Sequence, residues 1–540
     1  KSNSILIQEG STLNFGGTAV SSCDGGSYAS VYNSGILNMT GGAITTSKAH
    51  GLSNLGVANL SGNALIENSS ERYYALSNNG EVNLTSGKIT AINNIAVHNR
   101  ESGKITIDGN IEISATGSYD TVNNAGEINM FSGTISASTG NTMVVAAGGI
   151  FNMTGGIITT GTSHALYIAD TGAATLSDLA KIYSTAPLYS AVYNYGTLNI
   201  NGGEIDGNAT TAVVNQNQLN INSGTIKSSS TTYGGISNYA SLVMTGGTVY
   251  TSTKDALTSY NGATSSVSGG TLQSDGQYSF YNQSGATAEI GGTAYINSLI
   301  SQKQGILNKG ELTISGGTCD SDVESCLENG GTTTFTGGIF TGLSHFSVYN
   351  NGKGTMYIQG GTIQGADNSD CTAVIGNSGY LEISGGMQIG YDDITVETYS
   401  GSTTLIKGGT IETYTGDSIH NMEGAKMTIS DSAYVYSYDS PYVNISNEGV
   451  LDITGGTIKT DLSGLLQNSE TGVLTVTSSA NLVGASTASN KPFIYNSGNL
   501  NMSGLELDLM HYKFVHNYLQ GTLTLDNMTV RLTDSYVLYN

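Results

Sequence analysis

Short runs of alternating hydrophobic and polar residues recur along the whole chain. In one clear copy, Leu37 and Met39 flank a polar residue, and Ile44 follows a Gly41-Gly42 pair. A period of two residues is typical of a β-strand. A further hydrophobic position, such as Val31, stands just before each phrase. The pattern therefore predicts three short strands in each period.

The same phrase returns at a nearly constant distance. It reads Asn-x-Gly-x-Leu-x-(Ile/Met)-(Ser/Thr)-Gly-Gly-x-Ile, and clear copies occupy residues 33–44, 194–205 and 447–458. Counting degenerate copies, about 23 repeats fall between Gly17 and Asn527, with a mean period of about 23 residues. The array has no linker, so we expect one continuous domain over residues 1–540. Both ends lie inside repeat-like sequence, which favours a segment of a longer surface protein.

Three such strands cannot bury a hydrophobic face alone, but stacked copies can. If each strand pairs with the same strand one period later, the chain forms an all-β parallel β-helix, a solenoid. The rise per coil then equals the spacing between paired strands, about 4.8 Å. About 23 coils would make a rod of roughly 110 Å.

An asparagine opens each phrase and is expected to form a ladder along the axis. Asparagine tolerates a left-handed φ, and stacked side-chain amides can hydrogen-bond to one another. The sequence predicts this structural column at Asn33, Asn54, Asn78, Asn124, Asn194, Asn238, Asn308, Asn329, Asn377 and Asn447.

Composition supports this fold and excludes several others. The chain has 74 glycines but only 3 prolines and no tryptophan, so it is neither collagen nor a proline-rich linker. No apolar run reaches the roughly 20 residues of a membrane-spanning helix. Only 11% of residues are charged, and the formal net charge is −23. That charge repels phosphate, so we expect no nucleic-acid partner.

Tyrosine is abundant, and several tyrosines precede the ladder asparagine, where a side chain points outward. These candidate binding residues are Tyr32, Tyr193, Tyr281, Tyr349 and Tyr495. An exposed tyrosine can stack on a sugar ring or anchor a protein interface. The alternative is that tyrosine simply favours strands.

Polysaccharide cleavage is the rival interpretation, because many parallel β-helices degrade pectin. Asp392 and Asp393 are the only Asp-Asp pair, and paired carboxylates are what glycoside hydrolysis needs. However, no arginine lies between Arg100 and Arg531, and a lyase requires a cation to neutralise the substrate carboxylate. We therefore expect no catalytic residues, and a solvated loop is the favoured interpretation of the pair.

Acidic residues cluster at similar positions of neighbouring coils. These are Asp320, Asp322 and Glu324, then Asp367 and Asp370, then Asp392 and Asp393. Oxygen clusters suit calcium, although simple surface charge is the favoured interpretation and no other metal or cofactor is expected.

Four cysteines are too few for a disulfide scaffold. Cys319 and Cys326 stand seven residues apart in one coil, a spacing that permits a disulfide. Cys371 lies about two coils from Cys326, roughly 10 Å, which is beyond disulfide reach. Cys23 has no partner that the sequence identifies.

The phrase beginning at Asn33 resembles the repeats of cell-surface adhesin-like proteins of gut Firmicutes. Gly41-Gly42-Ala43-Ile44 also resembles the Gly-Gly-Ala-Ile element of chlamydial polymorphic outer-membrane proteins, although the Phe-x-x-Asn element of that family is mostly Val/Leu-x-Asn here. The resemblance implies a right-handed β-helix of the pectin lyase-like kind in an extracellular, bacterial setting.

The sequence thus favours a non-catalytic adhesin or display rod that binds a glycan or surface protein through its loops and tyrosine-bearing faces. Two alternatives stay open, which are a polysaccharide-active enzyme and a purely structural stalk or phage-type fibre. Association between rods is a further expectation, because neither end looks capped.

Overall fold

The computed structural model describes residues 3–23, 28–298, 303–322, 324–392, 394–440, 443–484, 489–509, 511–532 and 536–539. Every regular element among them is a β-strand. The strands form a right-handed parallel β-solenoid of about 22 turns, each with about 23 residues and three strands. This confirms the predicted fold class, with about one turn fewer than expected. No helix in the described part of the chain is long and apolar enough to cross a membrane.

One turn illustrates all the others. Strand β4 (Ala29–Asn33) ends at a ladder asparagine, β5 (Ile36–Met39) carries the Leu-x-Met alternation, and β6 (Ala43–Thr46) follows the Gly-Gly pair. Each pairs in parallel with its counterpart one turn later, as Asn33 does with Asn54. We call the three resulting sheets the Asn sheet, the Leu sheet and the Ile sheet.

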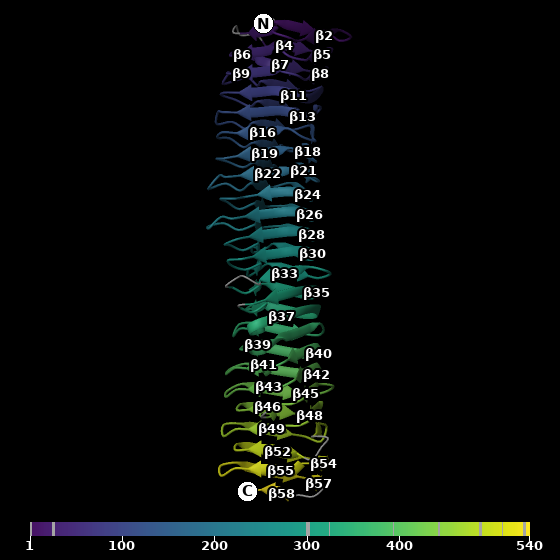
Figure 1. Cartoon of the computed structure of the whole chain (residues 1–540), viewed down its shortest axis with the longest axis vertical. Coiled ribbons are helices and arrows are strands. Elements are labelled where there is room, and N and C mark those ends of the chain that lie inside the picture. The colour runs from purple at the N-terminus through teal and green to yellow at the C-terminus, as the bar shows by residue number, and fades with distance from the viewer. Residues whose placement is uncertain are drawn as a thin grey trace. The chain divides into compact units, whose positions relative to one another are not determined.

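The two compact units of the chain are Lys1–Ser265, here the N-terminal unit, and Ser266–Asn540, here the C-terminal unit. Figure 1 shows the strands of each unit stacked turn upon turn. The prediction of a single unbroken domain over residues 1–540 stays a prediction.

The Asn sheet of the N-terminal unit contains β1 (Ile5–Ile7), β4, β7 (His50–Asn54), β10 (Leu76–Asn78), β12 (Val97–Asn99), β14 (Val122–Asn124), β17 (Met143–Val145), β20 (Leu166–Ile168), β23 (Val192–Asn194), β25 (Val213–Asn215), β27 (Ile236–Asn238) and β29 (Leu257–Ser259). That of the C-terminal unit contains β31 (Phe280–Asn282), β34 (Ile306–Asn308), β36 (Leu327–Asn329), β41 (Ile394–Thr398), β43 (Ile419–Asn421), β46 (Val443–Asn447), β49 (Gly464–Asn468), β52 (Ser489–Asn496), β55 (His511–Asn517) and β58 (Tyr536–Tyr539), with the ends of β37 (Thr332–Asn350) and β39 (Thr362–Asn377).

The separate strands of the Leu sheet are β2 (Thr12–Phe15), β5, β8 (Val57–Leu60), β15 (Glu127–Met130), β18 (Ile150–Met153), β21 (Ala173–Leu176), β32 (Thr287–Ile290), β38 (Thr355–Ile358), β44 (Lys426–Ile429), β47 (Val450–Ile453), β50 (Val473–Val476), β53 (Asn499–Ser503) and β56 (Thr522–Asp526). Those of the Ile sheet are β3 (Val20–Cys23), β6, β9 (Leu65–Asn68), β16 (Thr134–Ala137), β19 (Ile157–Thr160), β22 (Lys181–Ser184), β33 (Tyr295–Ser298), β45 (Tyr434–Ser437), β48 (Thr457–Thr460), β51 (Asn481–Val483), β54 (Glu506–Leu509) and β57 (Thr529–Leu532).

In other turns the Leu and Ile strands merge into one long strand that bends at the Gly-Gly pair or at a single glycine in its place. These strands are β11 (Glu81–Ala91), β13 (Lys104–Ala115), β24 (Thr197–Asp206), β26 (Gln218–Ser228), β28 (Ser241–Thr251), β30 (Thr264–Ser274), β35 (Glu311–Ser321), β40 (Tyr380–Gly390) and β42 (Thr403–Thr413). At the bend of β24, Gly203 has a φ of 78°, a value that favours glycine. A Cβ there would lie 2.5 Å from the Ala180 carbonyl oxygen, so the corner requires glycine.

Inward-pointing residues fill each unit with a narrow apolar core. In the N-terminal unit these are mostly aliphatic, such as Leu37, Met39 and Ile44, all fully buried. The C-terminal unit adds large rings, and Phe335 and Phe340 meet edge to face at 5.1 Å. The alternation read from the sequence therefore places the core correctly in both units.

The ten predicted ladder asparagines are all buried and lie in the Asn sheet of their own unit, six in the N-terminal unit and four in the C-terminal unit. Within a run, each amide donates to the next side chain, as Asn54 Nδ2 does to Asn78 Oδ1 at 2.8 Å. The same nitrogen also donates to the carbonyl of Glu81, which opens the Leu strand. The ladder therefore ties neighbouring turns together and also braces the corner between two sheets.

The column is longer than the sequence predicted, and it is also interrupted. Eight further members complete the runs: Asn99, Asn215, Asn282, Asn350, Asn421, Asn468, Asn496 and Asn517. Val145, Ile168, Ser259 and Thr398 take the ladder position where the column breaks. Thr398 keeps the connection, because its hydroxyl donates to Asn421 Oδ1 at 2.8 Å.

Candidate binding surfaces

The five predicted tyrosines all occupy the outward position before the ladder residue and are partly exposed. Three of them have local partners. Tyr32 lies 6.0 Å from the ring of Tyr28, and Lys309 Nζ lies 5.4 Å from the ring centre of Tyr281. Tyr349 stacks on Phe346 at 5.1 Å. Tyr32 and Tyr349 connect to further rings, because Tyr28 lies 5.5 Å from His50 and Tyr349 lies 6.5 Å from Tyr399. Tyr193 and Tyr495 also belong to larger surfaces.

Tyr193 is at the centre of an aromatic surface in the N-terminal unit, which we call the tyrosine strip. Its members are Tyr167, Tyr193, Tyr195, Tyr239 and Tyr260. The first two stack in neighbouring turns, with ring centres 6.1 Å apart and planes 16° apart. At the other end, Tyr239 and Tyr260 stack at 4.2 Å and 9°. The strip therefore offers ring faces on two pairs of neighbouring turns, with one turn without a ring between the pairs.

Two hydroxyl groups of the strip are held in the neutral form. Burial and the neighbouring Tyr195 raise the pKa of Tyr193, and burial with Tyr260 raises the pKa of Tyr239 to about 12. Gln216 lies between these two turns and donates from Nε2 to Tyr193 Oη at 3.4 Å. Rings, hydroxyls and an amide thus form an uncharged, amphipathic surface.

Sequence reasoning found only one member of this strip. Tyr167 was missed because Ile168 replaces the asparagine that marks the position. Tyr195, Tyr239 and Tyr260 directly follow the ladder position, in the turn between strands, whereas the predicted binding residues all precede it. A search for aromatic residues on both sides of the ladder position would have found all five.

A partly buried polar network supports the strip from the loop side. The ring of His164 lies 5.0 Å from that of Tyr193 and 5.2 Å from that of Tyr189. Its Nδ1 lies 3.1 Å from Ser190 Oγ, and burial lowers the pKa of the imidazole. Asn141 accepts from Ser163 at 2.7 Å and donates to Asp120 at 3.0 Å. These contacts link successive turns, so they hold the strip's edge in place.

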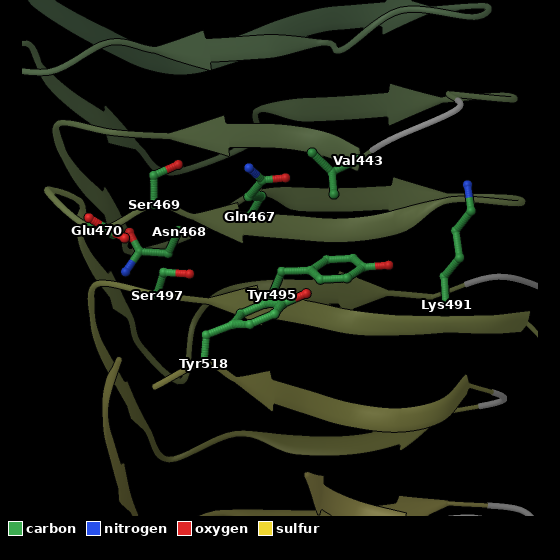
Figure 2. A pocket seen from close by; sticks show the side chains of 9 residues that line it. All are labelled: Val443, Gln467, Asn468, Ser469, Glu470, Lys491, Tyr495, Ser497 and Tyr518. Atoms are coloured by element: carbon green, nitrogen blue, oxygen red, sulfur yellow. The ribbon is translucent and has the colours of Figure 1, made fainter. Parts of the chain in front are cut away.

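Tyr495 lines a pocket of about 510 Å³ in the C-terminal unit. The rings of Tyr495 and Tyr518 lie together on one side, with Glu470 and Lys491 at opposite ends (Figure 2). Burial and the neighbouring Tyr518 raise the pKa of Tyr495, so its hydroxyl stays protonated. Ring faces, both signs of charge and small polar groups meet here, a combination suited to a polar ligand.

A titratable cluster occupies the same sheet in earlier turns of this unit. His420 Nδ1 lies 3.3 Å from Glu397 Oε1, and Nε2 lies 3.7 Å from Glu448 Oε1. Tyr399 donates to the other oxygen of Glu397 at 2.5 Å. The hydrogen bond to Glu397 raises the pKa of His420, and burial raises the pKa of Asp417 to about 6. His420 is thus paired with two carboxylates of the cluster, and the raised pKa values of His420 and Asp417 favour their protonated forms.

Those candidates for catalysis and calcium that the structure describes are not brought together as a site. Asp392 is exposed and accepts from Thr415 Oγ1 at 2.6 Å, while Asp393 lies outside the described residues. The side chains of Asp367 and Asp370 also lie outside them. Across the described ranges, no three His, Cys, Asp or Glu side chains are grouped to hold a metal. Neither the enzyme nor the calcium interpretation gains an argument from these residues.

The Cys319–Cys326 disulfide is not formed in this structure. Both are fully buried free thiols, and Cys319 Sγ lies 3.7 Å from the Cys326 carbonyl oxygen. Cys319 occupies the inward position that Ile296 holds one turn earlier, so it serves as a small core side chain. Burial raises the pKa of the Cys319 thiol. Cys23 is buried, and the side chain of Cys371 lies outside the described residues.

No protein-family model matches the chain, and no curated protein sequence is significantly similar to it.

Proposed function

We propose that this chain is a non-catalytic binding rod of the adhesin type, displayed outside a bacterial cell, with a glycan as its ligand. The observation that carries the proposal is the tyrosine strip. Tyr167, Tyr193 and Tyr195 offer rings on two neighbouring turns, and Tyr239 and Tyr260 offer rings on two more beyond the turn of Gln216. Sugars present apolar ring faces edged with hydroxyl groups, and tyrosine presents the same combination.

The geometry suits an extended chain better than a compact ligand. Turns of a parallel solenoid repeat every 4.8 Å or so, so contacts recur at regular intervals along the axis. Each ring contact is weak, but several engaged together by one polymer bind much more tightly. The pocket around Tyr495 and Tyr518 offers a second binding surface of the same chemistry in the C-terminal unit.

The test is binding of the purified chain to an array of neutral polysaccharides, mucin glycans and matrix proteins. We expect a saturable glycan signal that weakens at least tenfold in a Tyr193→Ala/Tyr239→Ala variant. A Tyr119→Ala/Tyr183→Ala variant is the matched control, because both tyrosines are exposed in the same unit but outside the strip. Equal loss in both variants, or no binding at all by a folded chain, would favour the structural stalk instead.

A further inference from the structure

A second hollow of the N-terminal unit has a different chemistry from the tyrosine strip. It has a volume of about 430 Å³ and lies among the loops that follow three successive Ile strands. Lys48 and Arg72 line it, with the hydroxyls of Ser47 and Ser69 and the ring of Tyr73. We call it the basic pocket. Glu71 is its one carboxylate.

Neither cation of the basic pocket forms an ion pair with a described carboxylate. In the described part of the chain, neither Lys48 nor Arg72 has a carboxylate within 4.0 Å. Other lysines of the same unit do pair, as Lys88 does with Glu112 at 3.6 Å and Lys104 with Glu127 at 3.9 Å. Two unpaired cations around one hollow are notable in a chain of net charge −23.

The loops that carry these cations are fixed by hydrogen bonds. Asn68 Oδ1 accepts from the backbone of Ser70 at 2.6 Å, and Ser70 Oγ accepts from the backbone of Arg72 at 3.2 Å. Asn93, in the next turn, donates to the Ser69 carbonyl at 3.0 Å. The backbone around Arg72 is therefore set before a ligand arrives, which lowers the entropic cost of binding.

An aromatic wall completes the pocket. The ring of Tyr73 meets the imidazole of His50 edge to face, with centres 5.1 Å apart. Burial and the Arg100 guanidinium lower the pKa of His50 to about 4, so this imidazole is neutral near pH 7. The charge that faces the hollow therefore belongs to Lys48, Arg72 and Glu71.

We propose that the basic pocket binds the anionic group of a sugar, a sulfate ester or a carboxylate. Arginine pairs with such oxyanions through two parallel hydrogen bonds, lysine adds a point charge, and Tyr73 provides a face for the sugar ring. The volume suits one or two sugar units. This inference rests on the proposed glycan binding and names a ligand class for one site.

The experiment compares matched glycans on the intact chain. The probes are a sulfated galactan oligosaccharide with its desulfated form, and sialyllactose with lactose. We expect each anionic member to bind more tightly than its neutral partner if its anion fits. Preference for the sulfated probe alone identifies a sulfate ester, and preference for the sialylated probe alone identifies a carboxylate. No preference in either pair overturns the proposal.

Variants then assign the preference to the pocket. Lys48→Gln/Arg72→Gln should weaken anionic-glycan binding about tenfold or more and leave neutral-glycan binding unchanged. Lys104→Gln/Lys181→Gln removes the same charge elsewhere in the unit and should change little. Equal losses in the two variants would overturn the proposal. If the first variant does not fold, Glu71→Gln supplies the test, because removing this carboxylate should strengthen anionic binding and unchanged affinity contradicts it.

The two proposals fail in distinguishable ways. Suppose that neutral glycans bind through Tyr193 and Tyr239 but the chain shows no preference for anionic glycans. Only the basic-pocket proposal is then overturned. Absence of all glycan binding by the folded chain removes both.

Discussion

The two units share one repeat but differ in charge and in what they bury. The N-terminal unit has nine basic and 15 acidic residues, a formal charge of −6, whereas the C-terminal unit has nine and 26, a charge of −17. The first keeps His50, His98 and His164 neutral through burial. The second holds Asp417 and His420 with raised pKa values.

This contrast teaches that the solenoid fixes only its inward positions. Each outward position is surrounded by solvent and by its neighbours one turn away, so its chemistry can change without affecting the core. The N-terminal unit accordingly carries the tyrosine strip and the basic pocket, while the C-terminal unit carries the titratable cluster around Glu397 and His420.

The largest expected effect tests whether the units unfold separately. Phe335→Ala in the C-terminal unit and Met153→Ala in the N-terminal unit each remove a fully buried side chain from the Leu sheet. We expect losses of about 4 and about 3 kcal/mol in the stability of the mutated unit. Hydrogen–deuterium exchange of the whole chain, read peptide by peptide, measures both. Equal loss of protection in both units after either change would contradict the two-unit division.

The ladder should matter similarly in both units. Asn215→Ala and Asn329→Ala each break an internal ladder position and remove two buried side-chain hydrogen bonds to the neighbouring asparagines, at a cost of about 2–3 kcal/mol. Asn220→Ala is the matched control, because its partly exposed amide bonds to Asn199 on the outer side of the Leu sheet. Denaturant unfolding should show a change below about 0.5 kcal/mol for the control. A ladder variant as mild as the control would show that the column adds little.

The response to pH should have opposite signs in the two units. His50 has a folded pKa of about 4, below its unfolded value, so stability of the N-terminal unit rises as pH increases from about 4 to 6.5. Asp417 has a folded pKa of about 6, above its unfolded value, so the C-terminal unit loses stability over about pH 4 to 6. The raised pKa of His420 adds a further loss of stability as the pH rises through the folded pKa of this imidazole.

Each effect should be up to about 3 kcal/mol, measured by exchange corrected for intrinsic rates. His50→Gln and Asp417→Asn should each flatten the response of their own unit. A response of the same sign in both units would refute the assignment of these groups.

Salt should produce the smallest difference. Like charges repel more strongly at −17 than at −6, and salt screens this repulsion. Raising sodium chloride from low to near-molar concentration should therefore stabilise the C-terminal unit by up to about 1 kcal/mol and the N-terminal unit by less. Thermal melts and hydrogen–deuterium exchange at each salt concentration measure this change in the stability of each unit. A larger gain in the N-terminal unit would show that local ion pairs outweigh net charge.

Much of the fold was predictable because the same pattern of hydrophobic, glycine and asparagine positions recurs in turn after turn. Alternation at Leu37 and Met39, the glycine pair and the asparagine fixed the three strands and the ladder. The candidate site was much less predictable. Tyr193 was found by its offset, whereas Tyr167 was hidden by the Ile168 substitution, and the seven-residue spacing of Cys319 and Cys326 suggested a disulfide for two thiols that pack in the core.

The sequence by itself therefore determined the solenoid, its period and its buried columns, since each depends on contacts between equivalent positions one turn apart. Only the tertiary structure decided which outward residues meet. Tyr167 and Tyr193 are 26 positions apart, and Lys48 and Arg72 are 24 apart, yet each pair contributes to one surface. Turn lengths vary from coil to coil, so the lateral position of a loop residue depends on how each loop folds over its neighbour.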